Sequence, residues 1–300
     1  MRGDGDGWVT CDLGHRHWGR HGAAGLLLRG PGDGSSRRPV LVQLRVEWSH
    51  HGGTWGLLGG ARDSHETPVD TALREAGEEG GIDPSRVRVS GAYTDDHGGW
   101  SYTTVLADVT ETFPVAPANA ESVELRWVPE DELASLALHP HFAITWPRLL
   151  ASPRAPVVIV DAANVVGSRP DGWWRDRLGA ARRLRDRLIL LARHGLSASR
   201  LPYEVDPARS DDTWYADVVM VTEGAARPLA GEASPDVRVV GAERSGDDAI
   251  VSLVAEHAGA AHRTTVVVTA DRELGRRCQS TDHRAVVARP GWLTALLDEL

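Results

Sequence analysis

Apolar residues in the first half of the chain fall into short runs separated by polar, Gly-rich segments. The runs are brief and several alternate with polar residues, a pattern typical of strands in a partly buried sheet. They predict strands over residues 23–28, 40–46, 87–93, 102–107 and 121–129. After the last strand we expect a short helix over 131–137, and residues 140–147 should then lead out of the domain.

One segment between these strands has the helical period instead. Apolar residues recur there at i, i+3, i+4 and i+7 and form a single stripe, made of Val69, Ala72, Leu73 and Ala76. Thr67 suits an N-cap, Pro68 suits the first helical position, and Asp70 opposes the helix dipole from the first turn. Because Gly80 and Gly81 provide a C-terminal stop, the pattern predicts a helix between Thr67 and this glycine pair.

The pattern restarts in the second half, after the proline-bearing segment 151–156. Apolar runs predict strands over 157–160, 218–222, 237–240, 264–269 and 285–288, with helices over 173–194, 247–257 and 292–297. Alternating strands and helices favour a doubly wound, Rossmann-like parallel sheet. We therefore expect two domains, residues 1–150 and 157–300, joined by a linker over 151–156, with α+β and α/β architecture.

Charge and composition narrow the classes of function. The net charge of −9 argues against a surface that coats nucleic acid, and no apolar run is long enough for a membrane span, so we expect a cytoplasmic protein. The two cysteines, Cys11 and Cys278, provide no disulfide framework. Cys11 lies near His15 and His17, but this spacing fits no standard zinc pattern and favours a structural or solvent-facing role.

Three glutamates on the predicted helix are the first candidates for chemistry. Glu75, Glu78 and Glu79 are spaced i, i+3 and i+4, so their carboxylates converge. Such a cluster is often only a solvated face, but oxygen ligands of this kind also suit Mg²⁺ or Mn²⁺. The whole stretch 60–82 resembles the Nudix box, GX5EX7REUXEEXGU, and its fixed positions are filled by Gly60, Glu66, Arg74, Glu75, Ala76, Glu78, Glu79, Gly81 and Ile82.

The resemblance implies an α/β/α sandwich with a mixed sheet and the hydrolysis of a nucleoside diphosphate linked to another moiety. It also implies that Glu75, Glu78 and Glu79 bind the metals together with the Gly60 carbonyl, while Glu66 and Arg74 pair to hold loop and helix together. The strands that hold Trp100 and Tyr102 border the cleft in Nudix relatives, so both are candidates for stacking on a nucleobase. Some relatives take an extra ligand or the general base from the region of Glu121. Trp55 belongs to a loop rich in His and Trp beside the predicted helix and could also stack on a base. Trp55 could equally cover the sheet edge.

Acidic residues of the second half follow predicted strands or begin a predicted helix. Each of Asp161, Asp247 and Asp271 could simply cap a helix or form a turn. Together, the stretches VVIVDAANVV, SGDDAIVSLV and VVVTADREL resemble the NYN branch of the PIN-like nucleases. That resemblance implies Mg²⁺ or Mn²⁺ at the three aspartates, with Asn164 orienting the site, Asp248 replacing or assisting Asp247, and RNA as the substrate.

Two alternatives of another class stay open. The C-terminal half could be a module that binds RNA or a nucleotide without cutting it, and the N-terminal half could be a ligand sensor. Arginines on the predicted helix 173–194 could guide an RNA backbone or form an ordinary charged face: Arg182, Arg183, Arg185, Arg187 and Arg193.

Overall fold

The computed structural model describes residues 3–32, 38–152, 154–170, 172–206, 209, 212–232, 234–259 and 263–300. The chain divides into two compact units, Met1–Ser152 and Pro153–Leu300. Part of the expected linker, residue 153, lies outside the described residues. Among the described helices, none is long and apolar enough to cross a membrane.

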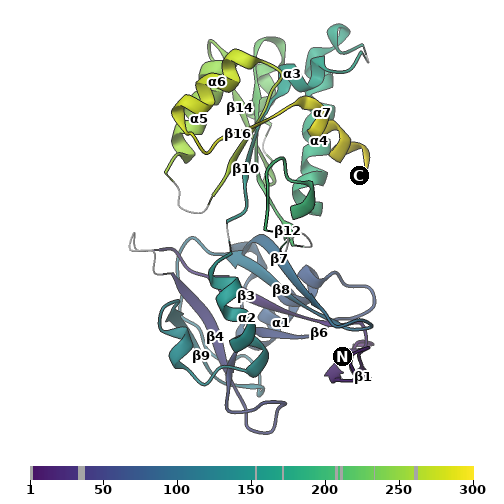
Figure 1. Cartoon of the computed structure of the whole chain (residues 1–300), viewed down its shortest axis with the longest axis vertical. Coiled ribbons are helices and arrows are strands. Elements are labelled where there is room, and N and C mark those ends of the chain that lie inside the picture. The colour runs from purple at the N-terminus through teal and green to yellow at the C-terminus, as the bar shows by residue number, and fades with distance from the viewer. Residues whose placement is uncertain are drawn as a thin grey trace. The chain divides into compact units, whose positions relative to one another are not determined.

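The first unit is built on a mixed sheet that follows the predicted apolar runs. The strands are β3 (Ala23–Arg29), β4 (Pro39–Arg45), β5 (Trp55–Gly56), β6 (Leu58–Ala61), β7 (Arg88–Asp96), β8 (Ser101–Asp108) and β9 (Ser122–Pro129). Strand β3 lies between β6 and β8, and β4 lies between β5 and β9. Strands β3 and β8 are parallel, whereas the other described neighbours, including β7 and β8, are antiparallel. Figure 1 shows the unit with this sheet between α1 and α2.

Helix α1 (Pro68–Gly80) forms where its capping signals predicted it. The Thr67 hydroxyl accepts a bond from the Asp70 N–H, and the Asp70 carboxylate accepts one from the Thr67 N–H at 3.0 Å. Gly81 ends the helix in the left-handed region, with φ 63°. The predicted stripe packs on the sheet, with Ala72 and Ala76 fully buried.

Two segments of the first unit differ from expectation. The helix expected over 131–137 is only a 3-10 turn, Leu133–Ser135. Residues 140–147 belong to a helix, α2 (Pro140–Leu150), because Pro140 suits the first helical position and Phe142, Trp146 and Leu149 form a buried stripe. A short 3-10 turn, Pro84–Arg86, joins α1 to β7.

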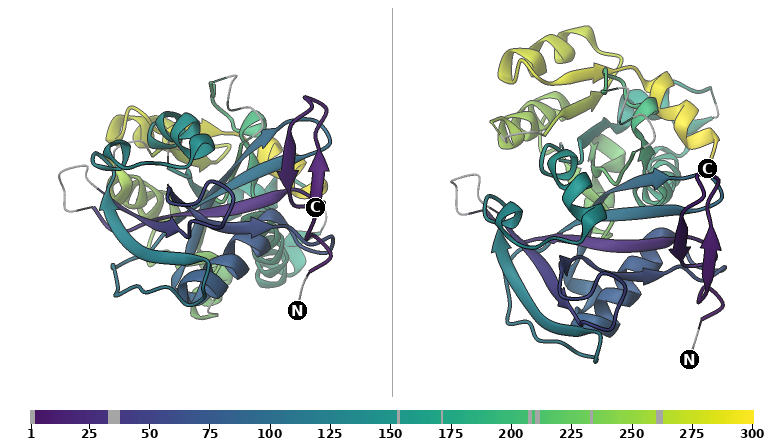
Figure 2. Two further views of the ribbon diagram at one scale, coloured as in Figure 1. Left: turned by 90° about the horizontal axis from the view of Figure 1, so that it is seen from below. Right: turned by 60° about the horizontal axis from the view of Figure 1, so that its bottom comes forward.

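An unpredicted hairpin precedes the sheet. Strands β1 (Trp8–Thr10) and β2 (Arg16–Trp18) pair with each other in antiparallel register and with no other strand that the structure describes. Figure 2 shows this hairpin, in purple, beside the sheet of its own unit.

The second unit contains a five-stranded sheet in which every described neighbour is parallel. Its spatial order is β14 (Val237–Gly241), β13 (Asp217–Thr222), β10 (Val157–Asp161), β15 (Thr265–Val268) and β16 (Val286–Ala288). Chain order therefore reverses between β10 and β15, as in doubly wound sheets. Helices α5 (Gly246–His257) and α6 (Arg272–Thr281) lie on one side, and α3 (Ala162–Gly167), α4 (Arg177–His194) and α7 (Pro290–Asp298) on the other (Figure 1).

Two details of this unit were not predicted. Helix α6 carries a mostly polar sequence with few apolar residues, and its buried residues are Leu274, Gly275 and Cys278, so no apolar run marks it in the sequence. The helix expected over 173–194 is interrupted, because the 3-10 turn Trp173–Arg175 precedes an N-cap at Asp176 that starts α4. The remaining short elements are β11 (Leu196–Ser197), β12 (Thr213–Trp214) and the 3-10 turns Ala198–Arg200 and Gly224–Gly231.

Candidate metal and nucleotide site

Glu79 lies at the back of the glutamate cluster and is 2% exposed. Its Oε2 accepts hydrogen bonds from the Gly59 N–H at 2.8 Å and from the Gln43 side chain at 3.0 Å. Burial raises the pKa of this carboxyl to about 8, repulsion from Glu75 adds to the increase, and the two hydrogen bonds oppose it. The site therefore holds a carboxylate that lacks a neutralising cation among its described hydrogen-bond partners.

Glu75 lies directly against the backbone of Gly60. A Cβ at residue 60 would fall 2.5 Å from Glu75 Oε1, so only glycine leaves room for this carboxylate. Burial raises the pKa of Glu75, whereas Arg74, which donates to Glu75 Oε1 at 2.8 Å, lowers it. The helix carboxylate and the end of β6 thus converge on one small volume.

Arg74 and Glu66 form the ion pair that the sequence resemblance implies. The Arg74 Nε and Nη2 donate to the two Glu66 oxygens at 2.6 and 3.0 Å, and Nη2 also donates to the Ala61 carbonyl. Hydrogen bonds from Arg74, the Asp63 N–H and Thr71 hold the pKa of Glu66 at about 2. This bidentate pair joins the loop before α1 to the helix.

Glu78 and Glu121 form the exposed side of the cluster. Glu78 is 60% exposed and lies 3.4 Å from Arg74 Nη1. Glu121 directly precedes β9 and is exposed, and its charge helps to raise the pKa of Glu75. The fold therefore brings Glu121 toward the helix glutamates, although forty-odd residues separate them in sequence.

The three aromatic candidates lie in different surroundings. Trp55 is buried, and the Arg126 guanidinium lies 4.5 Å from its ring centre. One face of the Trp100 indole is covered by the His17 imidazole, which stacks on it at 3.8 Å. Burial raises the pKa of Tyr102, and the charges of Glu79 and Glu75 raise it further.

Gln43 is a site residue that sequence reasoning missed. It is fully buried in β4, where its amide donates to both Glu79 and the Leu57 carbonyl and accepts from the Ser122 hydroxyl. The available signal was a single amide inside the apolar run 40–44, since a buried polar side chain normally has a hydrogen-bonding task.

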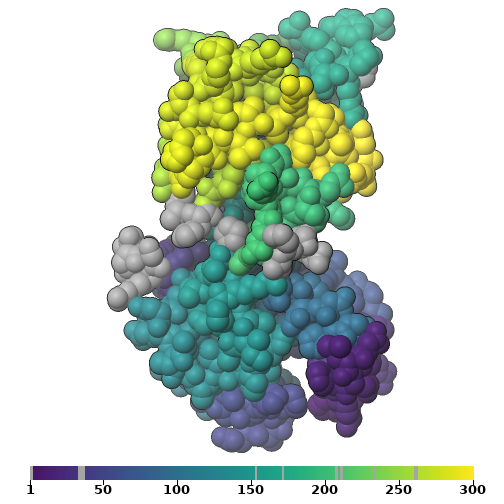
Figure 3. Space-filling view, in the orientation of Figure 1, coloured from purple at the N-terminus to yellow at the C-terminus, as the bar shows by residue number. Residues whose placement is uncertain are grey.

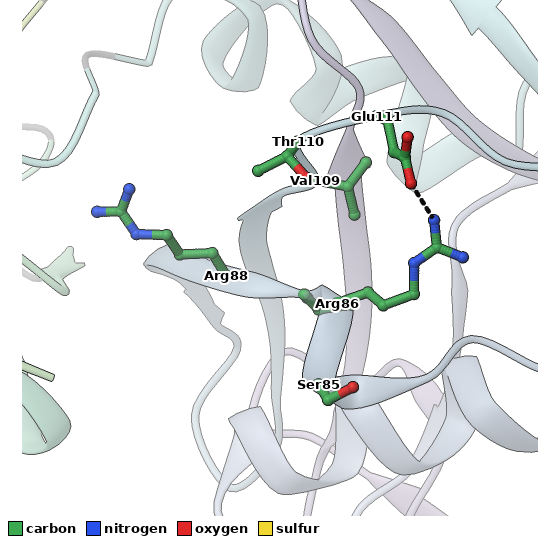
Figure 4. A pocket seen from close by; sticks show the side chains of 7 residues that line it. Ser85, Arg86, Arg88, Val109, Thr110 and Glu111 are labelled. Carbon is green, nitrogen blue, oxygen red and sulfur yellow. Dashed lines mark hydrogen bonds and ion pairs between the residues drawn. The ribbon is translucent and has the colours of Figure 1, made fainter. Parts of the chain in front are cut away.

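A cavity of about 390 Å³ lies elsewhere on the first unit (Figure 4). It is lined by residues 85–88 and 109–111, and within it Arg86 pairs with Glu111 at 3.2 Å. None of the predicted site residues lines this cavity.

In the second unit the acidic residues gather at the carboxyl edge of the parallel sheet. Asp161, at the end of β10, accepts from the Asn164 amide at 2.6 Å and from the Thr269 hydroxyl at 2.8 Å. Burial raises the pKa of Asp247, and the charges of Asp271 and Asp161 raise it further, so the three aspartates interact electrostatically. Thr269 was not predicted.

Several acidic residues also have the structural roles weighed for them. Asp161 is the N-cap of α3 and Asp271 is the N-cap of α6. Asp248 pairs with Arg277 at 2.5 Å, whereas the pKa of Asp247 is raised by burial and by the charges of Asp271 and Asp161. Most arginines of α4 that could guide RNA are engaged in ion pairs: Arg182 and Arg185 with Glu232, Arg187 with Asp298, and Arg193 with Asp236.

Comparison with known proteins identifies the first unit. Residues 19–149 match the NUDIX domain model. The chain is 54% identical over 160 residues to a Mycobacterium tuberculosis protein named "Putative 8-oxo-dGTP diphosphatase 3", a match that spans 51% of this chain and 72% of that protein. A Bifidobacterium longum nucleoside triphosphate pyrophosphatase/Nudix hydrolase fusion protein is 44% identical over 151 residues, covering 49% of this chain and 31% of the relative.

Among solved structures, a Nudix hydrolase from M. smegmatis, RenU, is 52% identical, with a TM-score of 0.46; the match covers 48% of this chain and 92% of that one. The chain belongs to the Nudix hydrolase family. It is accordingly a hydrolase that acts on phosphoric anhydrides, in a family that uses divalent metal ions and nucleotide substrates.

Proposed function

We propose that the first unit, over residues 1–150, is a Mg²⁺- or Mn²⁺-dependent pyrophosphohydrolase. Glu75, Glu78, Glu79 and the Gly60 carbonyl would hold the metal. The supporting observation is the fit between Glu75 and Gly60, because the carboxylate occupies the space that any Cβ at residue 60 would fill. Clustered oxygen donors with raised pKa values are what a hard divalent cation would compensate.

Other side chains of the site would position the metal-binding glutamates and accept a proton. Gln43 and the Gly59 N–H hold Glu79 from behind, and Arg74 restrains Glu75 from the side. A bound Mg²⁺ or Mn²⁺ supplies charge for the diphosphate and lowers the pKa of its bound water. Glu121 is our candidate for the general base that would accept a proton during hydrolysis, since it is exposed and its charge acts on Glu75.

The proposed substrate is a nucleoside triphosphate or another nucleoside diphosphate derivative. The name of the M. tuberculosis relative places 8-oxo-dGTP first among triphosphates to test. Tyr102, Trp100 and Trp55 remain proposed base-binding residues, and the charges of Glu79 and Glu75 help to raise the pKa of Tyr102. The complete glutamate set favours this enzyme over a ligand sensor.

The first test is a Glu78→Gln variant assayed on a nucleotide panel with Mg²⁺, Mn²⁺ and chelator. The panel holds nucleoside triphosphates, 8-oxo-dGTP, ADP-ribose, dinucleotide cofactors, nucleotide sugars and dinucleoside polyphosphates. Because Glu78 is largely exposed, the variant should stay folded while turnover falls by at least about a hundredfold. Glu124→Gln, an exposed acid on β9, is the matched control. Full turnover by the Glu78 variant would remove that residue from the metal site.

For the second unit, over residues 157–300, we propose an NYN/PIN-like ribonuclease. Asp161, Asp247 and Asp271 would bind Mg²⁺ or Mn²⁺, and Asn164 would orient Asp161. The observation that favours this is the position of Asp161 and Asp271, which follow β10 and β15 where the strand order reverses and where open parallel sheets bind ligands. Their charges also raise the pKa of Asp247. The alternative is a module that binds RNA or nucleotide without cleaving it, and fusion to a nucleotide hydrolase suggests a substrate at an RNA end.

Asp161→Asn separates these two readings of the second unit. If the unit is a nuclease, metal-dependent RNA cleavage by the wild-type chain should fall at least about a hundredfold in the variant. Asp186→Asn, which alters an exposed acid of α4, should cleave normally. RNA that binds to the wild-type chain but is never cut would support the binding module instead.

A further inference from the structure

The hairpin at the start of the chain and the turn between β7 and β8 bring four metal-ligating side chains together. Cys11, His15 and His17 come from the hairpin, and His97 comes from the turn. Each offers one ligand atom, and the four atoms all lie within 4.8 Å of one another. Around a tetrahedral Zn²⁺ such atoms are about 3.5 Å apart, so small side-chain movements would bring all four onto one ion.

The polar atoms in this cluster lack the partners that buried groups normally have. His17 Nε2 and His97 Nδ1 are both inaccessible to solvent, and neither makes a hydrogen bond with any residue that the structure describes. Cys11 is 4% exposed and is not in a disulfide. Buried nitrogens without partners cost free energy, and a shared cation would satisfy them together.

His97 also has the outer contact that metal-binding histidines commonly make. Its Nε2 lies 3.4 Å from an Asp95 carboxylate oxygen, which leaves the unpartnered Nδ1 for the cluster. A carboxylate behind a ligating imidazole fixes the ring and its tautomer. The His17 ring is held as well, because it stacks on Trp100 with an interplanar angle of 8°.

The hairpin needs a constraint of this kind because it has almost no core. Among residues 3–22, which are all described, the buried ones are Cys11 and three glycines, Gly5, Gly19 and Gly22. Both strands carry an exposed, half-buried, exposed pattern, and Trp8 and Trp18 are 47% and 44% exposed. In Figure 3 the hairpin stands out, in purple, from the surface of its unit. A two-stranded hairpin without a core is marginally stable in water.

We propose that Cys11, His15, His17 and His97 form a closed structural site for a borderline-soft divalent transition metal, Zn²⁺ in the first place. One thiolate and three imidazoles suit this class of ion, whereas the oxygen cluster on α1 suits Mg²⁺ or Mn²⁺. Four protein ligands leave no open position for substrate, so the site is structural rather than catalytic. The metal fastens the hairpin to the β7–β8 turn, where the Asp12 N–H already donates to the Gly98 carbonyl at 2.9 Å.

The four ligands of this site are separate from the proposed hydrolase metal ligands, although Trp100, a proposed base-binding residue, stacks on His17. Three of its ligands precede residue 19, where the match to the NUDIX domain begins. The expectation of a structural or solvent-facing role for Cys11, His15 and His17 rested on their spacing alone. Because the fourth ligand lies about eighty residues later in sequence, no spacing pattern could have shown it.

Co²⁺ titration of the metal-free, reduced full-length protein tests the site. We expect one equivalent of Co²⁺ to give a thiolate-to-metal charge-transfer band and the intense d–d bands of tetrahedral coordination, and Zn²⁺ to abolish both. Cys11→Ser should remove the thiolate band. It should also weaken Co²⁺ binding by more than about a hundredfold, because loss of a ligand should cost more than loss of an outer hydrogen-bond partner, which costs up to about a hundredfold. Asp95→Asn, which removes the outer partner, should weaken it by about ten- to a hundredfold.

Matched variants keep the result specific. Cys278→Ser removes the only other thiol, which is buried in α6, and should leave the band intact. His139→Ala alters a second histidine cluster, formed with His50 and His51, and should also leave the thiolate band intact. His97→Ala removes a proposed ligand and should abolish the band. Zn²⁺ should slow amide hydrogen exchange in residues 8–18 of the wild-type chain. A wild-type titration without a thiolate band, or a band that survives in folded Cys11→Ser protein, would overturn the proposal.

Discussion

Arg74 lies between two glutamates whose pKa values are displaced in opposite directions. Glu66 receives two hydrogen bonds from its guanidinium and others from Thr71 and the Asp63 N–H, so its pKa falls to about 2. Glu75 receives one hydrogen bond from the same side chain, but burial dominates and raises its pKa. The same arginine can thus stabilise a structural carboxylate while leaving its neighbour under-compensated.

The low pKa of Glu66 predicts how its contribution to stability depends on pH. Its folded-state pKa lies below the ordinary 4.5, so the stabilisation is fully present above about pH 4.5 and is lost as the pH falls toward 2. Glu66→Gln should lower the free energy of unfolding by about 2 kcal/mol at pH 7. Urea denaturation of both proteins between pH 7 and pH 3.5 should show this difference shrinking. A difference that stays constant over this range would contradict the ionised Glu66–Arg74 pair.

At the scale of elements, the Glu75 side chain of α1 reaches so close to the end of β6 that residue 60 has no room for a side chain. Gly60 provides that gap, and the Glu75 carboxylate fills it. The N-terminal capping box and Gly81 fix the two ends of α1, so the helix cannot easily shift to relieve a clash. The Glu75 carboxylate can therefore keep this position only while residue 60 has no Cβ.

Gly60→Ala tests this arrangement. The added methyl would lie 2.5 Å from Glu75 Oε1 and would displace the carboxylate. We expect nucleotide hydrolysis to fall by about a hundredfold, as for a misplacement of about 1 Å, together with a higher Mg²⁺ requirement. Gly291→Ala serves as the control, because a Cβ there meets open space. Normal rates at low Mg²⁺ would show that Glu75 does not depend on this gap.

Helices and strands could be predicted where the sequence carries a local signal. Site residues, likewise, could be predicted only where their partners are near in sequence or belong to a known motif. Helix α1 and strand β3 follow from capping residues and apolar runs, whereas the polar α6 and the short strands of the hairpin β1–β2 contain too few apolar residues to form such a run. Glu66 and Arg74 could be paired from the box. Gln43 and Thr269 could not be assigned partners, because their contacts connect segments 36 and 108 residues apart.

At the scale of the whole molecule, the chain consists of two units with separate apolar clusters. One cluster contains Leu26, Leu58 and Ala76 and lies within Met1–Ser152. The other contains Ile159, Val219 and Val267 and lies within Pro153–Leu300. Each proposed metal site is built from residues of a single unit, so each chemistry can be studied by point substitutions in the intact chain.

Separate clusters also determine how denaturation of this protein should be interpreted. A chain with two cores can unfold in more than one cooperative transition, and a single midpoint or a single unfolding free energy then describes neither core. Glu66 lies in the unit that holds the first core, so the loss caused by Glu66→Gln is assigned to the transition of that core. Tryptophan fluorescence sums over both units, so it would report only part of the change in stability caused by Glu66→Gln. A spectroscopic signal confined to residues 1–152 would report the whole change.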